Sequence, residues 1–222
     1  MMELYHCVSA RSFRTLWALE ELGLPYRLQM LPFPPRALAK GFLELNPLGT
    51  VPLLVDGEVR MTESGAICQY LAARAPGSPL AVLPDDPAYG AWLNWLHMAD
   101  ATLTFPQTLI LRYRYFEPGT RRLPQVAEDY ERWFLGRLRA VEAAASQHEY
   151  LCAGRFTMAD LAVGYALMLA DYIGLMSQWG PATQDYWMRL QQRPAFLRSL
   201  EVEKQAAIDQ HIDPTPSPLI RP

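Results

Sequence analysis

The sequence predicts an α/β domain with the element order β-α-β-α-β-β-α, followed by an all-α helical bundle. Strand-like and helix-like patterns alternate in the first part of the chain, a proline-rich run follows, and every periodic segment after that run has helical spacing. We therefore expect a first domain at 1–75, a linker at 76–87 and an all-helical domain at 88–222.

The first strand, helix and second strand form a βαβ unit. Leu4–Cys7 has the pattern of a strand, Phe13–Leu22 carries an apolar stripe at helical spacing, and Tyr26–Met30 is a second strand. Ser12 is well placed to cap the helix, and Gly23 is a residue that commonly ends one. This unit begins the predicted sheet.

A hairpin and another helix complete the first domain. A short helix is expected over 36–45, and an apolar strand then starts at Pro52. Asp56-Gly57 is typical of a two-residue hairpin turn, after which Val59–Met61 returns as a strand. Thr62-Glu63-Ser64 then opens the last helix of this domain.

The segment from Val51 to Ser64 suits a peptide with a negatively charged end. The Val51–Pro52 bond is the most plausible cis peptide of the chain, and a cis bond would turn the polar backbone atoms of Val51 outward for pairing with an extended peptide. The next helix offers unpaired N–H groups, a favourable dipole and the Ser64 hydroxyl, which suit a carboxylate.

The second part of the chain is helical in pattern. A long helix is expected over 89–116, with a kink near Phe105 because Pro106 lies in its body. Pro124 opens another long helix. Thr157 and Asp160 have the spacing of a capping box, which we interpret as a folding device without a catalytic role.

Composition narrows the class of protein. The net charge of −3 over 222 residues gives no electrostatic argument for nucleic acid or a membrane surface as a partner. The three cysteines are far apart, which fits neither a disulfide framework nor a metal site and is typical of a reducing compartment. No apolar stretch approaches the ~20 residues of a membrane span. We expect a cytoplasmic protein without a metal.

The V-P pair, followed about a dozen residues later by E-S-x-A-I, resembles the thioredoxin-like domain of the cytosolic glutathione transferases. The resemblance extends to about Lys204. It implies that Val51, before the cis Pro52, pairs with the cysteinyl backbone of glutathione, while Glu63 and Ser64 hold the γ-glutamyl end. It also implies a homodimer, with glutathione as the cosubstrate.

Making the glutathione thiol mostly thiolate at neutral pH requires its pKa to fall by ~2 units, or about 2.7 kcal/mol. A hydroxyl donor and the N-terminus of the first helix together suffice. We therefore expect the activating residue between Ser9 and Ser12. Ser9 is the first candidate catalytic residue and Ser12, partly occupied by capping, the second. Cys7 and Arg11 remain alternatives, the first for a mixed disulfide and the second for a ligand carboxylate.

The resemblance is incomplete in this loop. Ser9 aligns with the active serine or cysteine of the zeta-like and omega-like members, but the cysteine of the beta-like members falls on Arg11. The first serine of the bacterial S-R-S type falls on Ala10. These departures keep open a choice between active-site serines, and also between an enzyme and a protein without turnover.

The function that the resemblance implies is conjugation of glutathione to a small hydrophobic electrophile. Phe105 and Tyr113 are candidates for the hydrophobic substrate pocket, although an aromatic stripe at helical spacing is usually core. Isomerase, dehalogenase or peroxidase chemistry would use the same thiolate. The alternative is a non-catalytic glutathione- or ligand-binding or assembly module with a transferase-like fold.

Overall fold

A computed structural model describes residues 1–75 and 77–220 of the chain, which divides into two compact units. Unit 1 combines Met1–Ser78 with Gln192–Ser217, and unit 2 begins at Pro79 and runs to Gln191. The predicted division into domains at 1–75 and 88–222 is therefore incomplete, because Gln192–Ser217, expected in the helical domain, belongs to unit 1. Residue 76, the first of the predicted linker, lies outside the described residues, and 77–88 contain no helix or strand.

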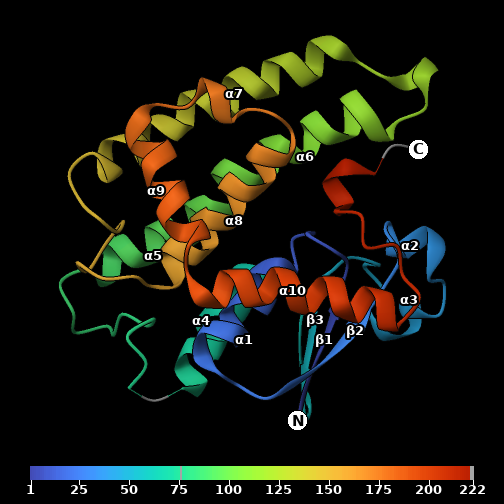
Figure 1. Ribbon diagram of the computed structural model, residues 1–222, viewed down its shortest axis with the longest axis horizontal. Coiled ribbons are helices and arrows are strands. Elements are labelled where there is room, and N and C mark those ends of the chain that lie inside the picture. The colour runs from blue at the N-terminus through green and yellow to red at the C-terminus, as the bar shows by residue number, and fades with distance from the viewer. Residues whose placement is uncertain (76, 221–222) are drawn as a thin grey trace. The chain divides into compact units, whose positions relative to one another are not determined.

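Unit 1 is built on a four-stranded mixed sheet of order β2-β1-β3-β4 (Figure 1). Strands β1 (Met2–His6) and β2 (Tyr26–Met30) are parallel, whereas β3 (Leu53–Asp56) runs antiparallel to β1 and pairs with β4 (Val59–Met61). Alternate residues of β1 are buried, as expected of a strand with one face on the core. The predicted strands are all present.

Four helices lie between or after these strands in the sequence. They are α1 (Phe13–Leu22), α2 (Pro35–Leu38), α3 (Phe42–Leu45) and α4 (Ser64–Arg74). The single helix predicted over 36–45 is wrong in detail, because the chain between α2 and α3 leaves helical geometry at Ala39 (φ −128°, ψ 67°). Apart from this split into α2 and α3, the element order agrees with the predicted α/β domain.

The β3–β4 turn is displaced by one residue from its predicted position. Asp56 pairs with Val59 across the hairpin, so the two turn residues are Gly57 and Glu58. Gly57 takes the positive φ, at 60°, a conformation that glycine adopts without a Cβ penalty. Asp56 instead remains in the strand and accepts a hydrogen bond from the Tyr70 hydroxyl of α4 at 2.7 Å.

The predicted helix over 89–116 is one run of four stretches that alternate α-helical and π-helical winding. These are α5 (Tyr89–His97), the π-helical η1 (Met98–Thr104), α6 (Phe105–Leu111) and the π-helical η2 (Arg112–Phe116). Pro106 lies just after the first π-helical stretch. Because proline lacks an N–H and its ring crowds the preceding turn, we attribute the change of winding to this residue.

The rest of unit 2 packs around one buried helix. It consists of α7 (Pro124–Ala145), α8 (Met158–Tyr172), α9 (Pro181–Gln191) and the 3-10 turns η3 (Gly119–Arg121) and η4 (Met176–Gln178). Residues 158–170 of α8 are all buried. The predicted capping box is confirmed. The Thr157 hydroxyl accepts a hydrogen bond from the Ala159 N–H, and the Asp160 carboxylate accepts one from the Thr157 N–H.

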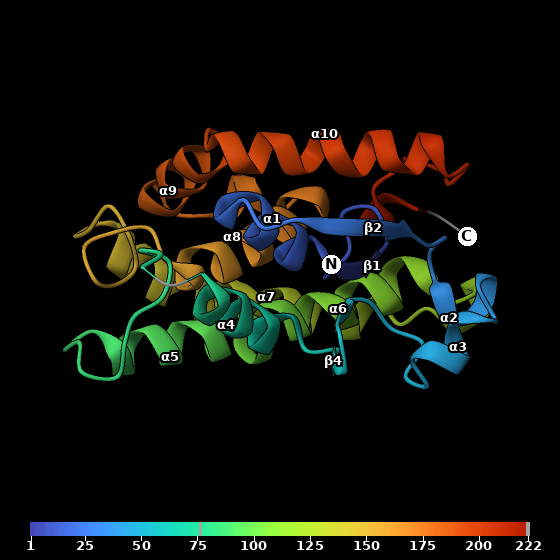
Figure 2. The same cartoon turned by 90° about the horizontal axis from the view of Figure 1, so that it is seen from below.

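Helix α10 (Pro194–Asp209) lies beside α1 in unit 1 (Figures 1 and 2). The Phe196 ring packs edge-on against Phe13 and Trp17, with centroids 5.6 and 4.9 Å apart. Just before α10, Arg193 makes a two-pronged ion pair with Glu21 of α1, at 2.6 and 2.9 Å. The chain then ends near the 3-10 turn η5 (Ser217–Leu219).

Within the described residues, the structure contains no helix that is both long and apolar enough to span a lipid bilayer.

Candidate functional site

The segment that leads into β3 has the backbone form expected from the sequence. The Val51–Pro52 peptide bond is cis, as is the Phe33–Pro34 bond, which the sequence did not predict. Val51 is half-buried and Pro52 buried. Val51 therefore lies at the entrance to β3, the strand that pairs with β1.

The N-terminus of α4 follows β4. Glu63 occupies the N-cap position in an extended conformation, and its exposed side chain makes no capping hydrogen bond. Ser64, the first residue of the helix, is buried. The side chain at the N-cap position most commonly accepts from the N–H groups of the first turn, and here the Glu63 side chain does not.

Arg14 of α1 reaches the start of α4 from inside unit 1. Its Nη1 atom donates a hydrogen bond of 3.0 Å to Ser64 Oγ, and its side chain is fully buried. A guanidinium has no acceptor atom, so Ser64 must accept on this side and keeps its own hydrogen for another partner. Sequence reasoning did not assign Arg14 a role. The available signal was a lone arginine in the first turn of a helix whose first seven residues are mostly apolar.

Ser9, the first candidate for thiol activation, is held by the C-terminal helix. Its Oγ donates to Glu203 Oε1 at 2.8 Å, its backbone N–H donates to Glu203 Oε2 at 2.8 Å, and the residue is 1% exposed. Its φ of 51° lies in the left-handed region. Because a hydroxyl has one hydrogen, Ser9 can donate to a sulfur only after it leaves Glu203.

Ser12 and Cys7 lie close together in the same loop. Ser12 Oγ accepts a hydrogen bond of 3.4 Å from the Cys7 backbone N–H, and it makes no side-chain cap on α1. Burial raises the pKa of the Cys7 thiol to about 12, which opposes formation of the thiolate that a mixed disulfide needs. Arg11, which lies between these two residues in the sequence, is half-buried.

The two candidates for the hydrophobic substrate pocket belong to unit 2. Phe105, the first residue of α6, is 53% exposed. Tyr113 in η2 is half-buried, with the Arg112 guanidinium carbon 5.4 Å from its ring centroid. Unit 1, by contrast, contains all of the candidate glutathione-binding residues.

A search of the described ranges, 1–75 and 77–220, finds no group of three or more His, Cys, Asp or Glu side chains able to hold a metal ion.

Comparisons with known proteins agree with this arrangement. Residues 8–74, which span the Ser9 loop, Val51 and Ser64, match the family of glutathione S-transferase N-terminal domains. Glutathione S-transferase 3 of Schizosaccharomyces pombe is 24% identical, over 98% of this chain and 97% of its own. The stringent starvation protein A homologue of Haemophilus ducreyi is 26% identical, over 82% of this chain and 81% of its own.

A solved structure extends the likeness to three dimensions. The ternary complex of BphK, a bacterial glutathione transferase, superposes with a TM-score of 0.80 at 26% identity, covering 90% of this chain and 98% of that one. The thioredoxin-like order of unit 1, the helical unit 2 and these relatives point to one family. Residues 8–74 match the glutathione S-transferase N-terminal domain family, and the chain as a whole is similar to cytosolic glutathione transferases in sequence and in fold.

Proposed function

We propose that this protein binds glutathione and conjugates its thiolate to small hydrophobic electrophiles. The observation that carries the proposal is the hydrogen bond from the buried Arg14 to Ser64 at the N-terminus of α4. This bond brings the positive charge of Arg14 to the start of α4 and leaves the Ser64 hydrogen to be donated to the carboxylate of the γ-glutamyl end.

The electrostatics of this contact favour an anion. Arg14 fixes Ser64 as an acceptor on its inner side, so the Ser64 hydrogen is available to a carboxylate at the helix tip. The N-terminal dipole of α4 adds roughly 0.3–1 kcal/mol, and a hydrogen bond to a charged group is worth about 1.5–3 kcal/mol. In this proposal the Glu63 carboxylate accepts from the γ-glutamyl ammonium group, which balances the two ends of the amino acid.

The rest of glutathione then extends toward β3 and the loop before α1. Val51 pairs with the cysteinyl backbone ahead of Pro52, and Arg11 meets a carboxylate of the tripeptide. We assign thiol activation to Ser9, with Ser12 as the second candidate. These roles rest on the match of the residue pattern to the family and on the position of both serines in the β1–α1 loop.

The electrophile and the assembly are proposed from the resemblance. Phe105 and Tyr113 are the residues that we propose to contact a hydrophobic electrophile, and we propose a cytoplasmic homodimer. Exposure of the large apolar Phe105 side chain supports its availability to another molecule.

Titration calorimetry with glutathione tests the binding step, and turnover with a chloronitrobenzene tests the chemistry. We expect Ser64→Ala to weaken glutathione binding at least tenfold, because one charge-assisted hydrogen bond is lost. The matched control is Ser78→Ala, which removes a hydroxyl outside α4. Equal affinity of the wild type and Ser64→Ala would contradict the proposed carboxylate site.

A non-catalytic binding or assembly module is the second candidate. Two observations favour it: one of the relatives is not named as a transferase, and the Ser9 hydroxyl donates to Glu203. Retention on immobilised glutathione without turnover of any aromatic electrophile would support this candidate over the enzyme. Absence of both would contradict both candidates.

A further inference from the structure

A cavity of about 530 Å³ lies in unit 2, where α7 packs against α9 and the turn before it (Figure 1). Its walls include Arg132, Gly136 and Arg139 of α7, and Trp179 and Gly180 just before α9. None of the candidate residues for glutathione or for the electrophile is among the described residues that line it. The volume is within the range typical of small-molecule sites. Unit 2 therefore has room for a ligand of its own.

Two glycines keep this cavity open. Gly136 lies at an exposed position in the interior of α7, and a Cβ built there would meet no atom within 4 Å. Glycine is less stable than alanine inside a helix, and no packing contact requires it at this position. Gly180 borders the cavity from the other side, where a Cβ would collide with the Glu142 carboxylate. The missing side chains leave the space between the two helices free.

Helix α7 brings two guanidinium groups to the cavity. Arg132 and Arg139 lie four residues before and three residues after Gly136, which places all three on one face of the helix. Arg132 forms an ion pair with Asp129. Arg139 is exposed and makes no hydrogen bond or ion pair among the described residues. Its planar fork of N–H donors matches the two oxygens of a carboxylate.

The carboxylate that borders the cavity, that of Glu142, is already engaged. Its oxygens accept from the Ala182 and Thr183 N–H groups and from Thr183 Oγ1 at 2.7–3.2 Å. The positive end of the α9 dipole therefore has its anion from within the protein. An anionic ligand would find its partner at the α7 wall, where Arg139 offers a guanidinium that the protein itself does not pair.

The opposite wall is apolar, with one unpaired donor. Trp179 is 5% exposed, and its buried Nε1 N–H has no hydrogen-bond partner among the described residues. A buried N–H without an acceptor is costly, and an oxygen of a ligand in the cavity would supply one. Leu135 and Leu138 add apolar surface. The cavity thus combines an apolar wall with donors that lack acceptors.

We propose that the cavity between α7 and α9 binds a small aromatic carboxylate. The carboxylate pairs with Arg139, and the ring lies over the bare backbone at Gly136 and against Trp179. Arg132 adds positive potential at the same face. A flat ring suits this space because no side chain projects from α7 between the two arginines. The inference goes beyond the proposed function and does not depend on it.

Titration calorimetry with naphthalene-2-carboxylate tests the proposal. We expect Gly136→Leu to abolish binding, because the leucine side chain fills the cavity while a better helix former replaces glycine. We expect Arg139→Gln to weaken binding about tenfold, because a charge-assisted pair is lost. The neutral naphthalene-2-carboxamide should bind the wild type at least tenfold more weakly than the carboxylate, for the same reason.

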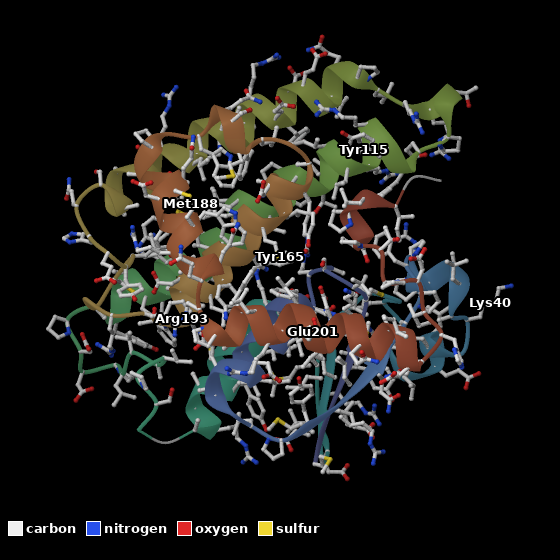
Figure 3. All side chains as sticks on the ribbon, in the orientation of Figure 1. Lys40, Tyr115, Tyr165, Met188, Arg193 and Glu201 are labelled. Atoms are coloured by element: carbon white, nitrogen blue, oxygen red, sulfur yellow. The ribbon has the colours of Figure 1, made fainter. Side chains whose placement is uncertain are left out.

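Matched controls alter the same kinds of group outside the cavity. Gly90→Leu changes an exposed glycine of α5 whose Cβ would also meet no atom within 4 Å. Arg137→Gln removes the same charge from α7, where the guanidinium lies 3.7 Å from the centroid of the Trp133 ring. Met188→Ala shortens an exposed side chain of α9 (Figure 3). All three should bind the carboxylate as the wild type does.

Thermal unfolding of each variant reports on the fold. If Gly136→Leu does not fold, Arg139→Gln and the carboxamide decide the question. Failure of the wild type to bind the carboxylate at millimolar concentration would overturn the proposal, as would equal affinity in the wild type and both cavity variants. Equal affinity for carboxylate and carboxamide would overturn the role of Arg139. Glutathione titrations are a separate measurement, so failure of the proposed function would leave this result unaffected.

Discussion

At the scale of single residues, unit 1 is organised by buried polar side chains whose direction is fixed. Arg14 can only donate, so Ser64 must accept on its inner side. Glu203 can only accept while ionised, so Ser9 must donate to it. Two serines of unit 1 therefore have opposite polarity toward the protein, because Ser64 accepts from Arg14 whereas Ser9 donates to Glu203.

Arg14→Met tests the first of these two directions. We expect it to weaken glutathione binding by about 10- to 100-fold, because a buried charge behind the γ-glutamyl carboxylate is lost. Titration calorimetry measures the affinity. Arg27→Met is the control, since it removes an exposed arginine of the same unit. An unchanged affinity in a folded Arg14→Met protein would show that the charge does not reach the ligand.

The chemistry of Cys7 provides a second residue-level prediction. With a pKa of about 12, only about one Cys7 thiol in ten thousand is ionised at pH 8. We expect iodoacetamide to modify Cys7 in the native protein far more slowly than after denaturation, as followed by mass spectrometry. Rapid modification, or a glutathione mixed disulfide on Cys7 in the native state, would contradict this expectation.

At the scale of elements, helix starts in unit 2 are capped from within the protein. Thr157 and Asp160 close the start of α8, and the Tyr186 hydroxyl of α9 donates to Asp160 Oδ1 at 2.9 Å. The start of α9 is capped from α7, because Glu142 accepts hydrogen bonds from Ala182 N, Thr183 N and Thr183 Oγ1 at 2.7–3.2 Å. A Cβ on Gly180 would collide with this carboxylate, so a larger residue there would have to displace Glu142 from the cap.

The Glu142 cap predicts a pH-dependent stability. Burial acts to raise the pKa of Glu142, but the hydrogen bonds from Thr183 and Ala182 outweigh it and lower the pKa below 4.5. A carboxyl whose pKa is lowered by folding stabilises the folded state above its unfolded pKa, and this contribution is lost as the pH falls through the folded value. We expect Glu142→Ala to cost about 1–2 kcal/mol in urea unfolding at pH 7.

The difference between wild type and Glu142→Ala should shrink as the pH falls below 4.5. Glu128→Ala, at an exposed position of α7, should change stability little at any pH. A cost for Glu142→Ala that stayed constant from neutral to acidic pH would mean that packing, and not the ionised cap, is responsible.

At the scale of the whole molecule, unit 1 is completed by a segment from the far end of the chain. Helix α10 covers α1 with the Phe196 ring and reaches the sheet, where Gln210 accepts from Met30 N and donates to the Leu28 carbonyl. The Glu203 contacts described above connect the same helix to the loop that follows β1. The thioredoxin-like unit is thus not a contiguous stretch of sequence.

A chain that ends at Gln191 should therefore lose the fold of unit 1. Without α10, the rings of Phe13 and Trp17 lose their edge-on partner, and truncation of such a buried aromatic alone costs about 3–5 kcal/mol. We expect the amides of β1 to lose protection in hydrogen exchange, while a chain ending at Ile220 keeps it. Full protection of β1 in the shorter chain would show that unit 1 folds without α10.

Local patterns in the sequence were sufficient for most of the fold and for part of the site. The strands of unit 1, the long helix over 89–116, the Thr157–Asp160 cap and the cis bond before Pro52 each depend on residues close together in the chain. The turn at Gly57 was misplaced by one residue and the 36–45 helix was predicted as one piece, because backbone pairing and local φ and ψ values decided those details.

By itself, the sequence determined the type and order of the elements. It also showed that Val51-Pro52 is followed along the chain by a polar helix start. Both follow from local periodicity, turn residues and capping. Only the tertiary structure decided that α10 joins unit 1, that Arg14 donates to Ser64 and that Ser9 donates to a carboxylate 194 residues away. The physical reason is that periodicity shows which face of an element is buried, but not which distant element covers it.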